Sequence, residues 1–270
     1  MTHFTLSAFG DEISPDLDEQ IRVLKANGIA YLECRSIAGQ VIIDFPIPQV
    51  EVYYRQLADA GIGVSAVGSP IGKTPITEDF APQLERFKKT LAVAHALHSG
   101  YIRMFSFYMP PGEAPAIYRQ AVLERWAQFI EAARGSGVVL LHENEREIYG
   151  DTAERCLDLL DSLASPLVKA TFDPANFIQC NDEPYPRAFK MLQKHIAYLH
   201  IKDSLRRDHS VVPAGQGDGH LPEILADLKH AGFEGFLSIE PHLNNNLPGG
   251  GPARFAIAAN ALRGLLAQHQ

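Results

Sequence analysis

Residues 138–145 read VVLLHENE, an apolar run that ends in polar and charged residues. Three later segments repeat this pattern, namely VKATFDPAN at 168–176, IAYLHIKD at 196–203 and GFLSIEPH at 235–242. Each apolar run has the length and composition of a buried β-strand. The runs end on or beside residues that can bind a metal ion: Glu143, Asp173, His200 and Glu240.

The spacing of these four residues predicts that they meet in space. They are separated by 30, 27 and 40 positions, about the length of a strand followed by a helix. In repeated strand–helix units, the carboxyl ends of successive strands lie at one mouth of the fold. Three carboxylates and one imidazole suit Mn²⁺, Mg²⁺ or Co²⁺ better than a metal that prefers thiolates. The sequence therefore predicts a metalloenzyme.

Short apolar runs alternate with segments of helical periodicity along the whole chain. Strands are predicted near residues 4–9, 29–34, 63–67, 101–106, 137–142, 167–172, 196–201 and 235–240. Helices are predicted near 16–27, 48–60, 80–98, 115–134, 152–163, 184–194, 221–231 and 252–267, and Gly61 and Gly232 stand where two of them should end. Eight such units without a linker favour a single (β/α)8 TIM barrel domain over residues 1–270. A doubly wound sheet is the alternative, although no GxGxxG or GxxxxGK[ST] motif supports a nucleotide-binding version.

Composition narrows the class of protein. A formal net charge of −8 disfavours a nucleic-acid partner, because phosphate binding needs clustered Lys and Arg. Cys34, Cys156 and Cys180 form no CxxC, so neither a disulfide framework nor a zinc knuckle is expected. The N-terminus lacks the pattern of an export signal and no apolar run reaches transmembrane length. We expect a cytoplasmic protein without a membrane or nucleic-acid partner, and a homo-oligomer is compatible with the sequence.

Each candidate ligand also has an ordinary structural interpretation. Glu143 could be a solvated strand end, Asp173 a turn residue before Pro174, His200 a core histidine and Glu240 a strand terminator. Four such residues at successive strand ends favour the functional interpretation. Glu12, Glu33 and Arg35 lie at the ends of the first two predicted strands, where an internal ion pair or a substrate contact is expected.

These residues resemble the recurring motifs of the xylose isomerase-like barrel superfamily, which includes sugar epimerases, isomerases, dehydratases and endonuclease IV. The resemblance extends over nearly the whole chain, because SAFGDEIS and YLECRS are also similar to the first two strand ends of that family. The motifs are Glu143-Asn144, Asp173 with Asn176, His200-Ile-Lys-Asp203 with Arg206, and Glu240-Pro241.

The resemblance implies roles for these positions. Glu143, Asp173, His200 and Glu240 would bind one divalent metal, with Mn²⁺ expected and Mg²⁺, Co²⁺ or Zn²⁺ as alternatives. Arg206 would contact a substrate hydroxyl or oxyanion. Asn176 stands where the family usually has histidine, so its hydrogen bonds to the substrate should differ. Glu145 and Tyr149 are the candidates for a further acid that family epimerases often carry after the first glutamate.

The residue types themselves fit one chemistry. Inversion of a carbon next to a carbonyl requires a proton to leave one face and return on the other. A divalent metal stabilises the enediolate, and two carboxylates serve as base and acid. Glu143 and Glu240 are the natural catalytic pair, and Lys202, Asp203 or His142 are expected to tune them.

Three further positions are candidates for substrate binding. Arg103 ends the fourth predicted strand, before the aromatic and proline-rich stretch FSFYMPPGE that could cover a sugar or pack on the rim. Lys73 and Glu145 follow the third and fifth predicted strands and could reach a hydroxyl. The aromatic residues Phe105–Tyr108 favour a keto-glycoside over a simple ketose.

The predicted function is that of a metal-dependent epimerase or isomerase acting on a keto-sugar or keto-glycoside. The alternative is a dehydratase, because the same enediolate could expel a β-hydroxyl. A repair endonuclease is disfavoured, since it would need more metal ligands and a basic face. A non-catalytic sugar-binding protein remains a fourth interpretation.

Overall fold

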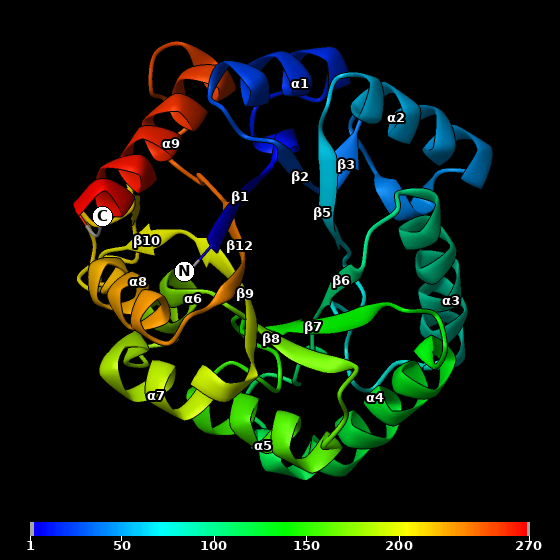
Figure 1. The fold of residues 1–270 in the computed structure, drawn as a ribbon. Helices are drawn as coiled ribbons and strands as arrows, with labels where there is room; N and C mark the ends of the chain where they lie inside the picture. The colour runs from blue at the N-terminus through cyan, green and yellow to red at the C-terminus, as the bar shows by residue number, and fades with distance from the viewer. Residues whose placement is uncertain (1–2, 269–270) are drawn as a thin grey trace.

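The structure, a computed structural model, describes residues 3–268. At its centre, eight parallel strands form a closed barrel in the order β1-β12-β9-β8-β7-β6-β5-β2 (Figure 1). The strands are β1 (His3–Phe9), β2 (Tyr31–Cys34), β5 (Gly63–Gly68), β6 (Tyr101–Met104), β7 (Val139–Glu143), β8 (Val168–Phe172), β9 (Ile196–Ile201) and β12 (Glu234–Ile239). The predicted (β/α)8 barrel is confirmed, and every predicted strand matches its observed bounds to within two residues.

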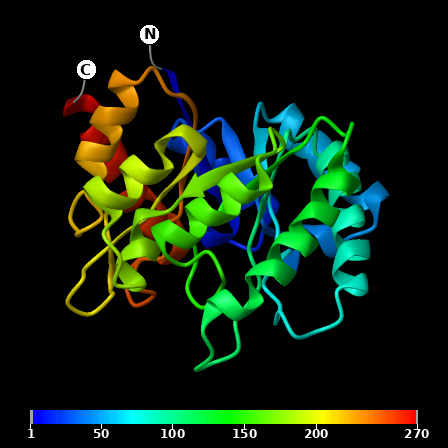
Figure 2. The same cartoon turned by 90° about the horizontal axis from the view of Figure 1, so that it is seen from below.

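Helices surround the barrel on all sides (Figure 1). The outer helices are α1 (Leu17–Ala26), α2 (Ile47–Asp59), α3 (Ala81–Ala96), α4 (Arg119–Ala133), α5 (Ala153–Leu163), α7 (Phe189–Leu192), α8 (Leu221–His230) and α9 (Gly250–Gln268). The short helix α6 (Pro174–Gln179) follows β8 and lies inside this ring. Seen from the side, the start of β1 and the end of α9 lie at one end of the barrel (Figure 2). The long loops around residues 70–80, 105–118 and 205–220 extend from the opposite end (Figure 2).

Local sequence explains several helix boundaries. Asp16 precedes α1 and its carboxylate accepts a hydrogen bond from the Glu19 N–H at 2.9 Å, as expected of an N-cap. Gly61 and Gly232 follow α2 and α8 with φ angles of +77° and +70°, which glycine adopts without steric cost. The predicted helix ends at these two glycines are therefore confirmed.

The structure departs from the predicted elements in three places. The predicted helix at 184–194 is broken into an irregular turn at Pro184–Ala188, the short α7, and a 3-10 turn at Gln193–His195, because Pro184 and Pro186 lack amide donors. Helix α6 was not predicted, and it is too short to show a helical period. Two small hairpins pair β3 (Ser36–Ile37) with β4 (Gln40–Val41), and β10 (Asp203–Ser204) with β11 (Val211–Val212).

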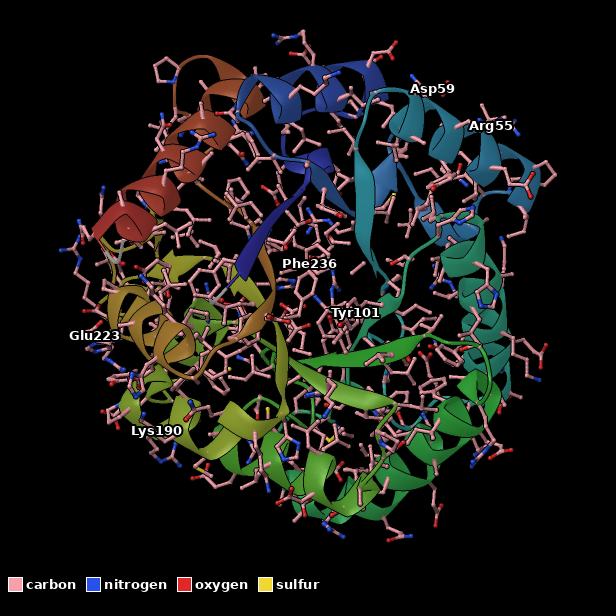
Figure 3. All side chains as sticks on the ribbon, viewed as in Figure 1. Arg55, Asp59, Tyr101, Lys190, Glu223 and Phe236 are labelled. Carbon is pink, nitrogen blue, oxygen red and sulfur yellow. The ribbon has the colours of Figure 1, made fainter. Side chains whose placement is uncertain are left out.

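Aromatic rings fill the barrel near the amino ends of its strands. The ring of Phe236 lies 5.0 Å from that of Tyr31 and 5.7 Å from that of Tyr198, between ring centroids. Tyr101 and Phe236 lie inside the ring of strands (Figure 3). The other labelled residues of that view lie on the outer helices: Arg55, Asp59, Lys190 and Glu223. A small molecule would therefore enter from the carboxyl end of the strands, where chemistry is found in this fold.

No helix within residues 3–268 is long and apolar enough to cross a membrane.

Candidate metal centre

The four predicted metal ligands lie together at the carboxyl end of the barrel. They come from four neighbouring strands of the barrel, β7, β8, β9 and β12. Glu143 ends β7, Asp173 follows β8, His200 lies in β9 and Glu240 follows β12. One ligand atom from each residue lies within 4.8 Å of the others, and all four residues are buried. Glu143, Asp173, His200 and Glu240 therefore form a continuous arc with a glutamate at each end, called the metal arc below.

Asp173 is positioned by its place at the start of a helix. Its Oδ1 atom accepts a hydrogen bond from the Asn176 N–H at 2.9 Å and thereby caps α6. Asn144 holds the Asp173 main chain from both sides, since its side chain donates to the carbonyl and accepts from the amide, each at 2.9 Å. The capping bond leaves Oδ2 to face the site, where it lies 3.8 Å from His200 Nδ1.

His200 is held between two carboxylates. Its Nδ1 atom lies 2.9 Å from Glu143 Oε1, and its Nε2 atom lies 3.2 Å from Oε2 of Glu33 in β2. Burial alone would lower the pKa of His200, but Glu143 and Glu33 raise it well above the usual value. If Nε2 keeps its proton for Glu33, Nδ1 is the nitrogen that is free to bind a metal.

Lys202 supplies a positive charge inside the arc. Its Nζ atom lies 2.7 Å from Asp173 Oδ2 and 2.8 Å from Glu240 Oε2, and the side chain is buried. Burial opposes the charged form, but the carboxylates of Asp173 and Glu240 raise the pKa of Lys202 well above its usual value. The ammonium group therefore neutralises part of the negative charge of the arc.

The donor set fits a divalent cation. Asp173 Oδ2 is fully buried, and no hydrogen-bond donor from residues 3–268 is aligned with it, although the Lys202 ammonium is close. Seven carboxylates lie in and around the site, against four Lys or Arg side chains and the imidazoles of His200 and His242. A buried set of three carboxylates and one imidazole suits a hard or borderline divalent ion.

The two glutamates at the ends of the arc are ion-paired. Burial alone would raise the pKa of Glu143, but the positive charges of His200 and Arg103 outweigh it and lower the pKa to about 2. Arg103 Nε lies 3.2 Å from Glu143 Oε2. Burial also opposes ionisation of Glu240, yet Lys202 and then His242 lower the pKa of Glu240 well below its usual value. Both glutamates are therefore ionised at neutral pH.

Arg35 connects Glu240 to the first strand end. Its guanidinium lies 3.2 Å from Glu240, 2.7 Å from Asp11 and 2.9 Å from Glu12. His242 also contacts Glu12, at 2.8 Å. The internal ion pair expected at Arg35 is thus present, and it links Glu240 to Asp11 and Glu12 after β1.

A cavity of about 210 Å³ opens at the arc. Five predicted site residues line it: Lys73, Arg103, Glu143, Glu145 and Glu240. Other lining residues were not predicted as substrate contacts, among them Ser69, Lys202 and His242, whereas Phe105 belongs to the aromatic stretch predicted to cover a sugar or pack on the rim. His242 was detectable from its position two residues after Glu240, whereas Ser69 stands in a loop without a recognisable motif.

The sequence profile of the xylose isomerase-like TIM barrel family matches residues 21–264. The chain belongs to this family. The resemblance seen in the sequence is thereby confirmed. No curated protein sequence matches significantly.

Solved structures with the same fold cover nearly the whole chain. The IolI protein with a bound zinc atom has a TM-score of 0.81 and 15% identity, covering 99% of both chains. The probable 3-DHS dehydratase AsbF of Bacillus anthracis has a TM-score of 0.77 and 16% identity, covering 97% of this chain and 99% of that one. The 3-keto-D-glucoside 4-epimerase YcjR of E. coli, in its apo form, has a TM-score of 0.74 and 14% identity, covering 98% and 100%. At these identities the likeness establishes the fold alone.

Two residues assigned through the family resemblance lie outside the lining of the cavity. Asn176 is buried, and its amide donates to Glu143 Oε1 at 3.2 Å and to the Asn144 carbonyl at 2.9 Å. Arg206 is exposed, and its guanidinium donates to the Asp182 carbonyl at 3.3 Å. In this structure Asn176 positions Glu143, and contact of either residue with a substrate stays a prediction.

The candidates for a further acid lie in different places. Glu145 lines the cavity and pairs with Lys73, whose Nζ atom lies 2.8 Å from Glu145 Oε2. Tyr149 donates its hydroxyl to Asp158 at 2.6 Å and does not line the cavity. Of the two, Glu145 is therefore the one that faces the site.

Proposed function

We propose that this protein is a metal-dependent epimerase or isomerase that acts on a keto-sugar or keto-glycoside through an enediolate. The observation that carries the proposal is the arc itself, in which three carboxylates and one imidazole converge at the floor of a polar cavity. Two of those carboxylates, Glu143 and Glu240, also line the cavity and can reach a substrate.

The two glutamates are arranged for proton transfer between opposite faces of a carbon. They end strands β7 and β12, which are separated by β8 and β9 in the barrel. One carboxylate removes the proton from the carbon next to the carbonyl, and the electron pair moves to the carbonyl oxygen. The other, once protonated, returns a proton to the opposite face of that carbon. Ion pairs with Arg103 and Lys202 hold the two side chains in place.

A bound divalent ion would polarise the carbonyl and stabilise negative charge on the enediolate oxygens. Glu143, Asp173, His200 and Glu240 would hold it, with Mn²⁺ as the proposed metal. Mg²⁺, Co²⁺ and Zn²⁺ are the alternatives, because all accept carboxylate and imidazole donors.

A dehydratase is the second candidate, and Lys202 is the residue that favours it. Its ammonium lines the cavity and is held by Asp173 and Glu240. A departing β-hydroxyl would need a proton, and the Lys202 ammonium would donate one more readily once a bound metal ion takes over Asp173 and Glu240, which raise its pKa. The first half of the reaction would be the same as in an epimerase.

A substrate screen tests the proposal. Free ketoses, inosose-type cyclitols and 3-keto-glycosides would be incubated with the protein and each of the four metals, and products followed by NMR and mass spectrometry. An epimerised or isomerised product of unchanged mass is expected. Loss of one water would identify the dehydratase, and no turnover of any substrate with any metal would contradict both enzymatic functions.

A further inference from the structure

A second and larger cavity lies on the same end of the barrel as the metal arc. It is a groove of about 640 Å³ beside the loops that follow β5, β6 and β7. Its apolar lining includes Pro75, Tyr108, Met109, Pro110 and Ile148. The protruding loop around residues 105–118 that forms one side of it is visible in Figure 2.

The groove borders the metal cavity along three loops. In the loop after β5, Lys73 lines the cavity and Pro75 lines the groove. The loops after β6 and β7 repeat this arrangement, since Phe105 is followed by Tyr108 and Glu145 by Glu147. A ligand anchored in the cavity can therefore extend into the groove without leaving these loops.

An ion pair with partly buried side chains lies at the boundary between the cavity and the groove. Lys73 Nζ lies 2.8 Å from Glu145 Oε2 and 4.3 Å from the ring centre of Phe105, and the Lys73 and Glu145 side chains are 31% and 19% exposed. Tyr108 of the groove lies near this pair, since its amide donates to the carbonyl of Thr74, the residue after Lys73, at 2.9 Å. Both side chains are partly exposed, so a ligand that extends from the cavity toward the groove would contact this ion pair or displace it.

The groove is preformed. Main-chain hydrogen bonds of 2.8–2.9 Å join the three loops, from the Tyr108 amide to Thr74, from the Ile76 amide to Tyr108 and from the Met109 amide to Glu147. A preformed apolar surface loses little entropy when it binds a ligand.

The charges around the groove restrict its occupant. Glu113, Glu147 and Asp151 line it, Asp151 is paired with Arg155, and none of the described residues that line it is Lys or Arg. An anionic ligand, such as a sugar phosphate or a nucleotide, would meet like charge here. An apolar group that is neutral or cationic meets proline, methionine and tyrosine surfaces with carboxylates at the edge.

We propose that the groove binds an apolar, uncharged or cationic aglycone of a keto-glycoside whose sugar ring occupies the metal cavity. This inference rests on the proposed function and narrows its substrate class. The cavity of about 210 Å³ would hold one sugar ring, and the groove of about 640 Å³ would hold the aglycone.

The test compares 3-keto-glucosides that differ only in the aglycone: methyl, phenyl, 4-(trimethylammonio)phenyl and 4-carboxyphenyl. The expected kcat/KM for the phenyl compound is about tenfold or more above that for the methyl compound, since tenfold corresponds to about 1.4 kcal/mol of ring burial. The trimethylammonio compound should match or exceed the phenyl compound, and the carboxyphenyl compound should lose most of the gain.

Substitutions of groove residues test whether the phenyl preference arises in the groove. Met109→Ala and Tyr108→Ala should each lower the phenyl-to-methyl ratio of kcat/KM several-fold. Ile117→Ala is the matched control, because Ile117 lies on the same protruding segment, is 67% exposed and does not line the groove. Equal ratios in all of these proteins would overturn the inference.

The outcomes separate this inference from the proposed function. Turnover of the methyl compound or of free ketoses without a phenyl preference would support the proposed function and contradict binding of an aglycone in the groove. If no substrate is turned over, the proposed function is wrong, and the groove is then tested by a binding experiment. Saturation-transfer NMR with phenyl β-glucoside should then show contact to the phenyl protons in the wild type and not in Tyr108→Ala, and absence of that contact in the wild type would overturn the inference.

Discussion

Glu33 and His200 form a buried hydrogen-bonded pair, with Glu33 Oε2 3.2 Å from His200 Nε2 and no exposed side-chain surface on either residue. The pair fixes the imidazole so that Nδ1 points toward Glu143 and Asp173. A carboxylate behind a histidine ligand orients the ring and increases its basicity toward a metal.

Glu33→Gln should therefore weaken binding of a divalent metal about 10- to 100-fold, since loss of such a partner typically has this effect. Isothermal titration of the metal-free protein with Mn²⁺ would measure it. Glu234→Gln is a suitable control, because Glu234 is exposed at the amino end of β12. An unchanged affinity in Glu33→Gln would show that the hydrogen bond does not support metal binding.

His200→Ala should abolish stoichiometric metal binding as well as activity, because it removes the single imidazole of the arc. Metal content after dialysis would be measured by mass spectrometry. His95→Ala, on the exposed side of α3, controls for incidental binding by histidine and should retain one metal per chain. Full metal content in His200→Ala would contradict the assigned ligand set.

Glu143→Gln and Glu240→Gln should each reduce kcat by roughly 10²–10⁴-fold, the usual contribution of a general acid or base. Each amide preserves the volume of the side chain, so the circular dichroism spectrum should be retained. Steady-state kinetics on the substrate found in the screen would measure the loss. Near-wild-type turnover in either variant would rule out the two-carboxylate mechanism.

Lys202→Met should destabilise the metal-free protein by about 3–5 kcal/mol, because it leaves the buried carboxylates of Asp173 and Glu240 without their ammonium partner. A bound divalent ion would restore the missing positive charge. The rise in melting temperature on adding saturating Mn²⁺ should therefore be larger in Lys202→Met than in the wild type. An equal rise in both proteins would show that Lys202 does not take the place of the ion's charge.

Much of the fold was predictable because apolar residues are spaced differently in strands and in helices. The apolar runs ending at Glu143 and His200 are buried strands, as predicted. The irregular region at 184–194 was not predicted, because proline at two positions removes amide donors while the apolar pattern continues. Helix α6 was missed because six residues are too few to establish a period.

The candidate site was predictable in part. The convergence of the four ligands follows from their common place at strand ends, which the sequence shows directly. The contacts of Glu33 and Arg103 depend on how side chains from β2 and β6 turn inside the barrel, and no sequence pattern reports that. Asn176 and Arg206 were assigned from the family resemblance, and their contacts here depend on the local loops.

The central claim is that the arc, loaded with metal, removes and returns a proton next to a carbonyl. The most direct measurement is exchange of that proton in D₂O, followed by NMR, with Mn²⁺ and with EDTA. The account predicts that deuterium enters at the carbon next to the carbonyl in the presence of Mn²⁺, and that EDTA or Glu143→Gln stops the exchange. Turnover of a substrate without any deuterium at that carbon, or exchange that continues at full rate in EDTA, would contradict it.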